Sequence, residues 1–547
     1  MNSKSPSPAG EYDLVVIGSG VGGLATALAA VESGMSVAVL EKDKMIGGGT
    51  CLSYGGLWAG CNHIAKGQGI EDSPEAVMEY MRFVAGDQAD EEHMRAYVES
   101  APVALEAFER LGVEIQLLPG FTDHYYPVAP GSTEVGRSLQ AAPTSLKDLG
   151  EYGDKIRDSH IDPHRISVSE IIAWGGLVNR RHHDQAVTAK REKDKVRTGG
   201  AALIAHFVRA LLARDTVPFL EVGAERLLYE NGEVAGVVTN TGQQVRARRG
   251  VVLATGGWEG DTEITKNFEG LPGWHSPFPK AVSGDGYHLA TGAGAATALI
   301  RNNLAVMVGL PVPPPTKDGE TEFRLVQINE CLMPHIIIVN AHGERFSDET
   351  YFQDTAAAIR DFDVWKREFR NLPCYLLFDS QYVENFSFCG SDVGTPPPDW
   401  VDRADTLEGL AGKLGISKDG LRTGVERFNE FARDGVDLDF HRGEKKWRLA
   451  NLEGFSDGTN HNPSLGPLEK GPFYGVQLAP AAFVPSGGVR TDCNANVIDT
   501  WGEPIAKLFA VGNTAAHLEY GVGYQAGYSL TAAMTFAYRC VEHLQHQ

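Results

Sequence analysis

The stretch Glu11–Tyr54 decides the fold: EYDLVVIGSGVGGLATALAAVESGMSVAVLEKDKMIGGGTCLSY. Asp13–Ile17 is a short run of apolar β-formers, which predicts a buried parallel strand. Leu24–Ser33 is rich in alanine and predicts a helix, which ends at Gly34. Ser36–Leu40 predicts a second strand. The order of strand, glycine-rich turn, helix and strand is typical of a Rossmann-like dinucleotide-binding unit.

The glycines of the turn GSGVGG have separate expected roles. Gly18 permits the tight turn, Gly20 lets the backbone approach a pyrophosphate, and Gly23 lets the helix pack closely on the strand. The anionic pyrophosphate is expected at the helix N-terminus, where free N–H groups and the helix dipole favour it. Glu41 follows the second strand, about twenty residues after the first glycine, where an acid accepts hydrogen bonds from ribose hydroxyls.

Two further stretches repeat the pattern of a buried strand that ends in small residues. They are VVLATGG at Val251–Gly257 and LFAVGN at Leu508–Asn513. A glycine-rich loop also follows the second predicted strand. Three such strand ends from distant parts of the chain indicate a long ligand, FAD rather than NAD. The sequence holds no second G-x-G-x-x-G, so a separate NAD(P)H domain is not expected.

The composition narrows the class of protein. With 547 residues the chain is expected to form two domains or one large composite with an ample core. A net charge of −22 argues against nucleic acid and anionic membranes as partners. No apolar run approaches the length of a membrane span, and the polar start Met1–Gly10 is not a secretory signal. Seven scattered cysteines form no C-x-x-C, which fits a reducing cytoplasm.

One cluster could suggest a metal site. Arg180–Asp184 contains two adjacent histidines and an acid. Adjacent side chains on a helix point in different directions, and no further ligand follows at a useful spacing. A solvated face is therefore favoured, and no metal is predicted.

The chain changes character at about Ala305, where a proline-rich segment is followed by strands and helices rich in aromatics up to Tyr474. We expect an FAD-binding domain at residues 1–304, an inserted catalytic domain at 305–475, and the return of the FAD-binding domain at 476–547.

Longer motifs make the chain resemble a known superfamily. They are GSGVGGLATALAA, the GRS at Gly136–Ser138, LATGGWE, SGDG, IIIVNAHGERFSDE, CYLLFD, ERFNEFARDGVDLDFHRGE, NPSLGPLEKGPFYGV, SGGVRTD and GNTAA…AAMTF. The chain resembles the fumarate reductase and succinate dehydrogenase flavoproteins, and most nearly their 3-ketosteroid Δ1-dehydrogenase branch. The resemblance implies an α/β fold, with a glutathione-reductase-type FAD domain and an inserted cap-like catalytic domain.

The resemblance also implies a mechanism. A tyrosine hydroxyl and a backbone N–H of the C-terminal loop bind the substrate ketone, and they stabilise the charge that develops on its oxygen. A second tyrosine, from the inserted domain, takes the α proton as a tyrosinate. A third tyrosine, from the loop before the GRS motif, assists the second. Flavin N5 takes a hydride from the β carbon, so a C=C bond forms beside the ketone.

By position, the resemblance assigns these roles to residues of this chain. Gly527 matches the backbone donor, Tyr351 matches the base, and Tyr125 or Tyr126 matches the assisting phenol. The ketone-binding tyrosine is where the chain departs, because the motif position holds Gly523 and no proline follows. Tyr524, one residue later, is favoured for the role. Glycine at 523 is expected to leave room in the pocket, which puts the size of the ketone in question.

Two other functions compete with ketone desaturation. A fumarate-reductase-like enzyme would reduce an enoate, but dicarboxylate binding favours arginine pairs, and the C-terminal loop holds none before Arg539. A flavin-binding protein without catalysis is disfavoured by phenols in all three expected regions. The segment Thr50–Ser53 lacks the histidine that links flavin in succinate dehydrogenases, so noncovalent FAD is expected.

A cyclic ketone or steroid and an external electron acceptor complete the expected partners. The residues predicted to bind FAD are Gly18, Gly20, Gly22, Gly23, Glu41, Lys42, Gly48, Gly49, Thr50, Ser53, Gly55, Gly56, Ala224, Thr255, Gly256, Gly257, Asp285, Gly512, Asn513, Tyr528 and Leu530.

Overall fold

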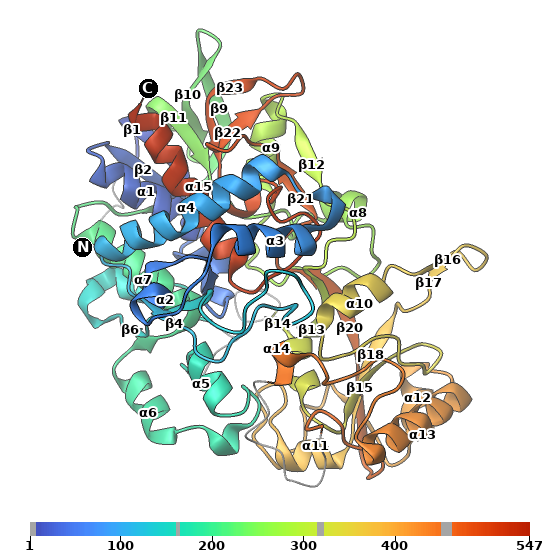
Figure 1. Ribbon diagram of the computed structural model, residues 1–547. Coiled ribbons are helices and arrows are strands. Elements are labelled where there is room, and N and C mark those ends of the chain that lie inside the picture. Colours follow the sequence, from blue (N-terminus) through green and yellow to red (C-terminus); the bar gives the residue numbers. More distant parts are fainter. Residues whose placement is uncertain (1–6, 160–164, 314–321, 450–461, 547) are drawn as a thin grey trace.

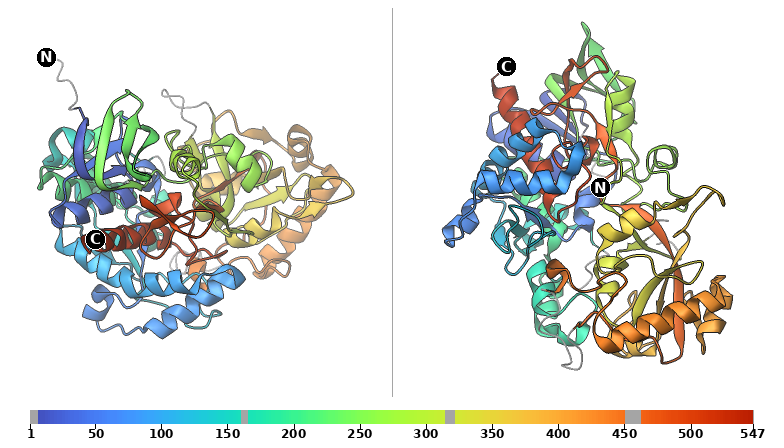
Figure 2. Two further views of the ribbon diagram at one scale, coloured as in Figure 1. Left: turned by 90° about the horizontal axis from the view of Figure 1, so that it is seen from above. Right: turned by 45° about the vertical axis from the view of Figure 1, so that its right-hand side comes forward.

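The protein has two lobes in the computed structural model, which describes residues 7–159, 165–313, 322–449 and 462–546. Figure 1 shows the larger lobe at the upper left and the smaller lobe at the lower right. The smaller lobe is built from the middle of the chain, and Figure 2 shows the two lobes side by side in both further views.

A sheet of eight strands forms the centre of the larger lobe. Its order is β22-β23-β11-β1-β2-β8, and the hairpin of β9 and β10 joins it through β11. Val15 of β1 lies opposite both Ala38 of β2 and Val251 of β11, and Val251 in turn lies opposite Leu508 of β23, all in parallel pairs. The three strands expected to end at the cofactor are therefore neighbours. The strands are β1 (Gly10–Ile17), β2 (Val37–Glu41), β8 (Phe219–Leu220), β9 (Ala224–Glu230), β10 (Glu233–Thr239), β11 (Gln244–Leu253), β22 (Asn496–Ile498) and β23 (Pro504–Ala510).

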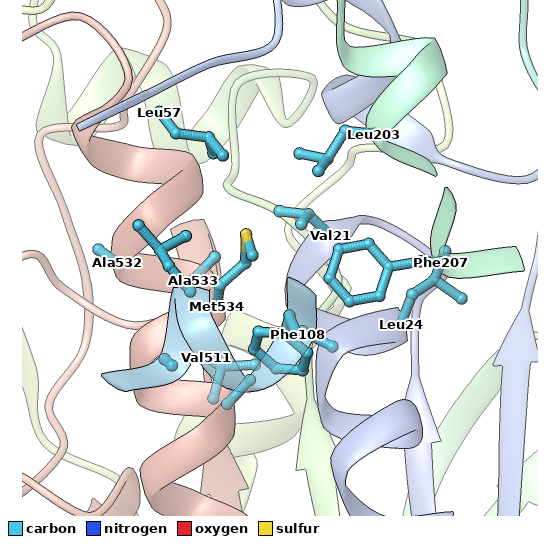
Figure 3. Packing of buried hydrophobic residues seen from close by; sticks show 14 of the residues in the cluster. Val21, Leu24, Leu57, Phe108, Leu203, Phe207, Val511, Ala532, Ala533 and Met534 are labelled. Carbon is cyan, nitrogen blue, oxygen red and sulfur yellow. The ribbon is translucent and has the colours of Figure 1, made fainter. Parts of the chain in front are cut away.

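Successive side chains of β1 point to opposite faces of this sheet, and each face is covered by a separate apolar cluster. Leu14 and Val16 join one apolar cluster, with side chains of α1 (Val21–Glu32), α4, α7 and α15. Val15 and Ile17 join another, with side chains of the β9–β10 hairpin. A strand buried on both faces is apolar without interruption, as the segment LVVI is. Figure 3 shows the helical side, where Leu24, Phe207, Phe108 and Met534 come together from four helices.

A six-stranded antiparallel sheet forms the smaller lobe. Its order is β14-β13-β20-β18-β15, and β19 also pairs with β20. Apolar clusters cover both faces, and α12 and α13 pack on one of them. β20 continues to Ala482, so this sheet extends past residue 475. The strands are β13 (Val306–Val312), β14 (Glu322–Arg324), β15 (Ile336–Asn340), β18 (Cys374–Phe378), β19 (Asp402–Ala404) and β20 (Phe473–Ala482).

Smaller elements complete the molecule. A three-stranded sheet of β3, β5 and β4 lies beside the N-terminus of α15. The remaining strands are β3 (Gly56–Trp58), β4 (Ile115–Leu117), β5 (Ser138–Ala141), β6 (Thr144–Ser145), β7 (Val196–Arg197), β12 (Thr297–Leu299), β16 (Phe362–Asp363), β17 (Glu368–Phe369) and β21 (Gly487–Val489). The other helices are α2 (His63–Gly67), α3 (Pro74–Ala85), α4 (Glu91–Arg110), α5 (Val168–Ala173), α6 (Gln185–Lys193), α7 (Gly199–Leu212), α8 (Thr262–Phe268), α9 (Asp285–Gly292), α10 (Phe352–Ala358), α11 (Ser380–Asn385), α12 (Leu407–Leu414), α13 (Lys418–Asp434), α14 (Lys446–Leu449) and α15 (Tyr528–Gln545).

The predicted fold class, a Rossmann-like FAD-binding domain with an inserted second domain, is confirmed. In the parts of the chain that the structure describes, no helix is long and apolar enough to cross a membrane.

Candidate active site

A cavity of ≈ 300 Å³ lies where the two lobes meet. Its floor comes from the carboxyl ends of β1, β11 and β23, the edge at which α/β sheets of this kind bind ligands. Its far wall comes from the smaller lobe and carries Phe352, Trp447 and Phe483. The cavity is thus continuous from the expected nucleotide site to an aromatic chamber.

Most of the residues predicted to bind FAD line this cavity. Gly23 and Tyr528 are not in its wall. The lining members are Gly18, Gly20, Gly22, Glu41, Lys42, Gly48, Gly49, Thr50, Ser53, Gly55, Gly56, Ala224, Thr255, Gly256, Gly257, Asp285, Gly512, Asn513 and Leu530.

The glycines of the first turn make the close approaches that a Cβ would prevent. A Cβ on Gly18 would lie 2.3 Å from the carbonyl oxygen of Ala254, and Gly18 has a φ of +104°. A Cβ on Gly23 would lie 2.0 Å from the carbonyl oxygen of Gly18, so α1 rests directly on the turn. Gly20 precedes α1 and gives it no side-chain cap, which leaves the helix N-terminus facing the cavity. This cradle fits a pyrophosphate.

Glu41, the last residue of β2, and Lys42 after it already have hydrogen-bond partners in the protein. Glu41 accepts hydrogen bonds from the Ser19 N–H at 3.0 Å and from the Ser19 hydroxyl at 2.6 Å. Burial raises the pKa of Glu41, although these hydrogen bonds oppose the rise. Lys42 Nζ lies 2.6 Å from the Asp285 carboxylate and 2.7 Å from the Ser283 hydroxyl. Both bonds from Ser19 end on Oε2, and Oε1 accepts from the Asp43 N–H at 2.8 Å, so Oε1 keeps one lone pair that can accept a ribose hydroxyl.

Tyr351 and Tyr125 lie together beside the aromatic chamber. Tyr351 precedes α10 and is 5% exposed, and its ring centroid lies 6.2 Å from that of Tyr125. The Tyr351 hydroxyl donates a long hydrogen bond, 3.4 Å, to the His124 carbonyl. Burial raises the pKa of Tyr125, and Tyr351 acts against that rise. Tyr126 instead has its ring 5.1 Å from Lys446 Nζ, so Tyr125 is the phenol next to Tyr351.

Tyr524 and Gly527 line the cavity on the C-terminal loop. The Tyr524 ring lies 5.1 Å from Phe352 and 5.5 Å from His124. Gly527 precedes α15 with a φ of +87°, and a Cβ there would lie 2.5 Å from the Leu57 carbonyl carbon. A glycine is therefore required where the loop presses on β3.

The expectation that glycine at 523 leaves room in the pocket is wrong. A Cβ on Gly523 would lie 2.2 Å from Val84 Cγ1 and 2.5 Å from the Val84 carbonyl oxygen, so this glycine faces α3 and has no void beside it. The glycine lets the loop lie against the helix, and Tyr524 is then the residue that faces the cavity.

The other two phenols of this loop are packed in the core. Tyr520 and Tyr528 are 1% and 3% exposed, and their rings stack with centroids 3.8 Å apart. The Tyr528 hydroxyl donates to the Glu519 carboxylate, which also lies 3.2 Å from His517 Nδ1. Burial raises the pKa of Tyr528, and the charge of Glu519 raises it further. Neither ring reaches the cavity wall.

The sequence analysis missed His124, which lies at the centre of these contacts. It is 2% exposed, and its ring centroid is 3.5 Å from that of Trp447. Its Nε2 accepts a hydrogen bond from the Ala526 N–H at 3.1 Å, and its Nδ1 lies 2.9 Å from the Gln353 amide. The one available signal was its place beside Tyr125 in the stretch TDHYY.

Within the residues that the structure describes, no group of three or more His, Cys, Asp or Glu side chains could hold a metal ion. The solvated face predicted for Arg180–Asp184 is present at Arg181, His182 and Asp184, which are exposed, but His183 is buried. His183 Nε2 lies 3.1 Å from the Gly176 carbonyl oxygen, and Asp184 caps α6.

The fold and this cavity together define an FAD-dependent oxidoreductase. The sequence matches the FAD binding domain family over residues 13–530, and the chain belongs to that family.

Characterised relatives match almost the whole chain. A 4-oxocyclohexanecarboxylate 2-dehydrogenase of Sinomonas cyclohexanicum is 36% identical, over 97% of this chain and 92% of that protein. A 3-oxosteroid 1-dehydrogenase of Mycobacterium tuberculosis is 32% identical, over 98% and 99%. The crystal structure of a 3-ketosteroid Δ1-dehydrogenase from Sterolibacterium denitrificans, in complex with 1,4-androstadiene-3,17-dione, superposes with a TM-score of 0.87 at 27% identity, covering 98% and 99% of the two chains. The resemblance stated from the motifs is confirmed.

Proposed function

We propose that the protein is an FAD-dependent dehydrogenase that introduces a C=C bond α,β to a ring ketone. The observation that carries this proposal is the meeting of three distant segments at one cavity. Phe121 of the first loop, Phe352 at the start of α10, and Tyr524 with Gly527 of the C-terminal loop line it. Tyr125 and Tyr351 are not in its wall, but the Tyr351 ring lies 6.1 Å from that of the lining Trp447 and 6.2 Å from that of Tyr125. The relatives named as dehydrogenases of an oxocyclohexane and of oxosteroids support the same reaction.

Each residue has a chemical role in this proposal. Tyr524 and the Gly527 N–H hold the ketone oxygen and stabilise the enolate charge that develops on it. Tyr351, as a phenolate, removes the α proton, and Tyr125 beside it receives that proton or supports the anion. Bound FAD supplies the acceptor for the hydride that leaves the β carbon. The ketone thus loses one proton and one hydride, and the new C=C bond balances the step.

The walls of the aromatic chamber support an uncharged ring as the substrate. Apolar and aromatic side chains surround it, and this lining suits a steroid or a smaller cyclic ketone. A dicarboxylate, which the competing fumarate-reductase-like activity would bind, needs charged partners that this lining does not offer. The apolar and aromatic lining side chains are Leu118, Phe121, Leu139, Val168, Ile171, Ile172, Leu325, Ile328, Phe352, Trp447 and Phe483, and the uncharged polar side chains of Tyr54, Ser138, Asn329 and Tyr524 also line the cavity.

The proposal includes noncovalent FAD, an external electron acceptor and a cytoplasmic location. Cys51, on the segment 50–53, is buried, and burial raises the pKa of its thiol to about 12, which disfavours the reactive thiolate. All seven cysteines are free thiols, which supports a reducing compartment.

Anaerobic mixing tests the proposed function directly. The purified protein is mixed with cyclohexanones and with saturated 3-ketosteroids, and the flavin absorption band is followed. Bleaching by a ketone, with the enone as product, is the expected result. Reoxidation of the dithionite-reduced protein by fumarate, with no bleaching by any ketone, would favour the enoate reductase instead.

The loop tyrosines are separated by three matched variants. Tyr524→Phe removes the proposed carbonyl donor and is expected to lower kcat/KM by roughly 10²–10³-fold. Tyr520→Phe and Tyr528→Phe are expected to lower thermal stability and FAD retention, because both rings are packed in the core. If Tyr520→Phe or Tyr528→Phe shows the kinetic loss and Tyr524→Phe does not, Tyr524 is not the carbonyl donor.

A further inference from the structure

We infer that His124 is a positioning residue, which fixes the ketone-binding loop relative to the proposed base through hydrogen bonds of its ring and its backbone. The inference rests on the proposed function and adds a residue to it. His124 does not line the cavity, so it acts through the residues that it contacts, of which Ala526 is in the cavity wall.

The contacts of His124 reach every segment that supplies a proposed catalytic group. Its backbone N–H donates to Gln525 Oε1 at 3.0 Å, and its ring accepts from the Ala526 N–H. Both contacts are on the C-terminal loop, directly before Gly527. Its carbonyl accepts from the Tyr351 hydroxyl, and its own chain continues into Tyr125. One residue therefore connects the carbonyl donor, the base and the assisting phenol.

The hydrogen bonds determine the protonation of the ring. A backbone N–H only donates, so Nε2 of His124 accepts and carries no proton. The neutral ring then carries its proton on Nδ1, which needs an acceptor. The Gln353 amide lies 2.9 Å away, and its Oε1 has no partner among the described residues in the orientation recorded. A 180° flip of the Gln353 amide, which exchanges its oxygen and nitrogen, places Oε1 next to Nδ1 of His124.

Packing holds the ring in this orientation. The ring is tilted by 34° against Trp447 at 3.5 Å and faces the Tyr524 ring at 5.5 Å. Gln525 is held as well, because its Oε1 accepts from the Tyr80 hydroxyl at 2.5 Å. The loop before Gly527 is thus fixed from two sides. Proton abstraction depends on the distance between base and bound ketone, and a misplacement of about 1 Å can cost roughly 10²-fold in rate.

Three substitutions of His124 separate positioning from simple packing. The amide oxygen of His124→Gln can replace Nε2 as the acceptor for Ala526. The shorter amide of His124→Asn can replace only Nδ1, and His124→Leu replaces neither. We expect kcat per bound FAD to fall by about tenfold or more in the Leu and Asn variants and to recover to within about threefold in the Gln variant. KM is expected to change by less than about threefold, because the apolar chamber still binds the ring.

Equal kcat values for the Gln and Asn variants would overturn the inference, as would a Leu variant within twofold of the wild type. If the His124 variants do not fold, Gln353→Glu and Gln353→Leu give the same comparison from the other side of the ring. Glu still accepts from Nδ1 and should keep kcat, whereas Leu should lose it, and equal values would overturn the inference. If no ketone reduces the flavin of the wild-type protein, the proposed function and this inference are both overturned.

Discussion

Tyr351 has a charged neighbour that can stabilise a phenolate, Lys445. Lys445 Nζ lies 5.0 Å from the centre of its ring, and a nearby positive charge stabilises a phenolate. Burial works to lower the pKa of Lys445, but Asp348 and Asp354, at 2.9 Å and 2.8 Å, raise it, so the ammonium keeps its charge. Tyr126 has a similar neighbour in Lys446, at 5.1 Å, so Tyr351 is favoured over Tyr126 by its place beside Tyr125 and Trp447 at the aromatic chamber.

Tyr351→Phe is expected to lower kcat by roughly 10²–10⁴, because general-base catalysis contributes about that much. The change removes one oxygen and little volume, so the melting temperature and FAD content are expected to change modestly. Stopped-flow flavin reduction measures the rate, and the flavin spectrum after acid release measures the cofactor. A variant that keeps more than about a tenth of the wild-type kcat would exclude Tyr351 as the base.

Glu259 is a buried acid in a different situation. Neither of its carboxylate oxygens has a hydrogen-bond partner within the described part of the chain, and the residue is 2% exposed. Burial raises its pKa from 4.5 to about 8, and the charge of Glu269 adds to this. The unfolded chain therefore loses this proton at a lower pH than the folded protein does. Stability falls as the pH rises from about 4.5 to about 8 and is constant above that range.

Glu259→Gln removes this pH dependence and keeps the shape of the side chain. The variant is expected to match the wild type near pH 4.5 and to exceed its stability by more than about 2 kcal/mol at pH 8. Thermal unfolding at a series of pH values measures the difference. A gain of the same size at both pH values would show that Glu259 is ionised in the folded protein.

At the scale of elements, a buried ionic cluster connects the turn after β15 to the segment that follows α13. Arg345 lies 2.6 Å from Glu349 and 2.8 Å from Asp437, and Arg442 donates to the carbonyl oxygens of Cys331 and Ile336. Burial works to raise the pKa of Asp437, but the hydrogen bond and charge of Arg345 hold it below its usual range. These pairs fix the part of the smaller lobe from which Tyr351 and Lys445 extend.

Arg345→Met is expected to destabilise the protein by about 3–5 kcal/mol, because it leaves buried carboxylates without their partner. Arg427→Met is the matched control. Arg427 pairs with Asp439 at 2.6 Å, but its side chain is 57% exposed, and solvent screening leaves such a pair little effect on stability. Urea unfolding of the two variants gives the comparison. Similar losses for both would mean that the buried cluster is not a structural centre of the lobe.

The sequence predicted those elements that local patterns specify. The apolar run of β1, the glycines of its turn and the two later glycine-ended strands gave the central sheet, because parallel neighbours must bring their carboxyl ends to one edge. The conformation of the C-terminal loop did not follow from its sequence. Gly523 is needed because Val84 packs directly against it, and His124 is held by contacts with α10 and Ala526. Contacts of this kind, between segments far apart in the chain, leave no repeating pattern in the sequence.

At the scale of the whole molecule, the cavity is shared by the two lobes. Its nucleotide end is built from the glycine-ended strands of the larger lobe, and its aromatic end is closed by Phe352 and Trp447 of the smaller one. The segment Thr50–Ser53 lies between these ends, and Thr50 also accepts a hydrogen bond from the Val21 N–H of α1. A ligand that fills the cavity therefore touches both lobes and stabilises their arrangement.

Removal of FAD is expected to lower the melting temperature of the protein, because the cofactor binds the folded chain and not the unfolded one. Its contribution is RT ln(1 + [L]/Kd), about 2.7 kcal/mol when FAD is present at 100 times its Kd. The apoprotein is prepared by release of the flavin at low pH and refolding, and FAD is then titrated back while thermal unfolding is measured. The melting temperature should rise with the logarithm of the FAD concentration. In Gly20→Val the new side chain enters the pyrophosphate cradle, so a higher FAD concentration should be needed for the same rise. A flavin that stays with the acid-precipitated protein would contradict noncovalent binding. A melting temperature that does not respond to FAD would show that the folded protein does not bind it.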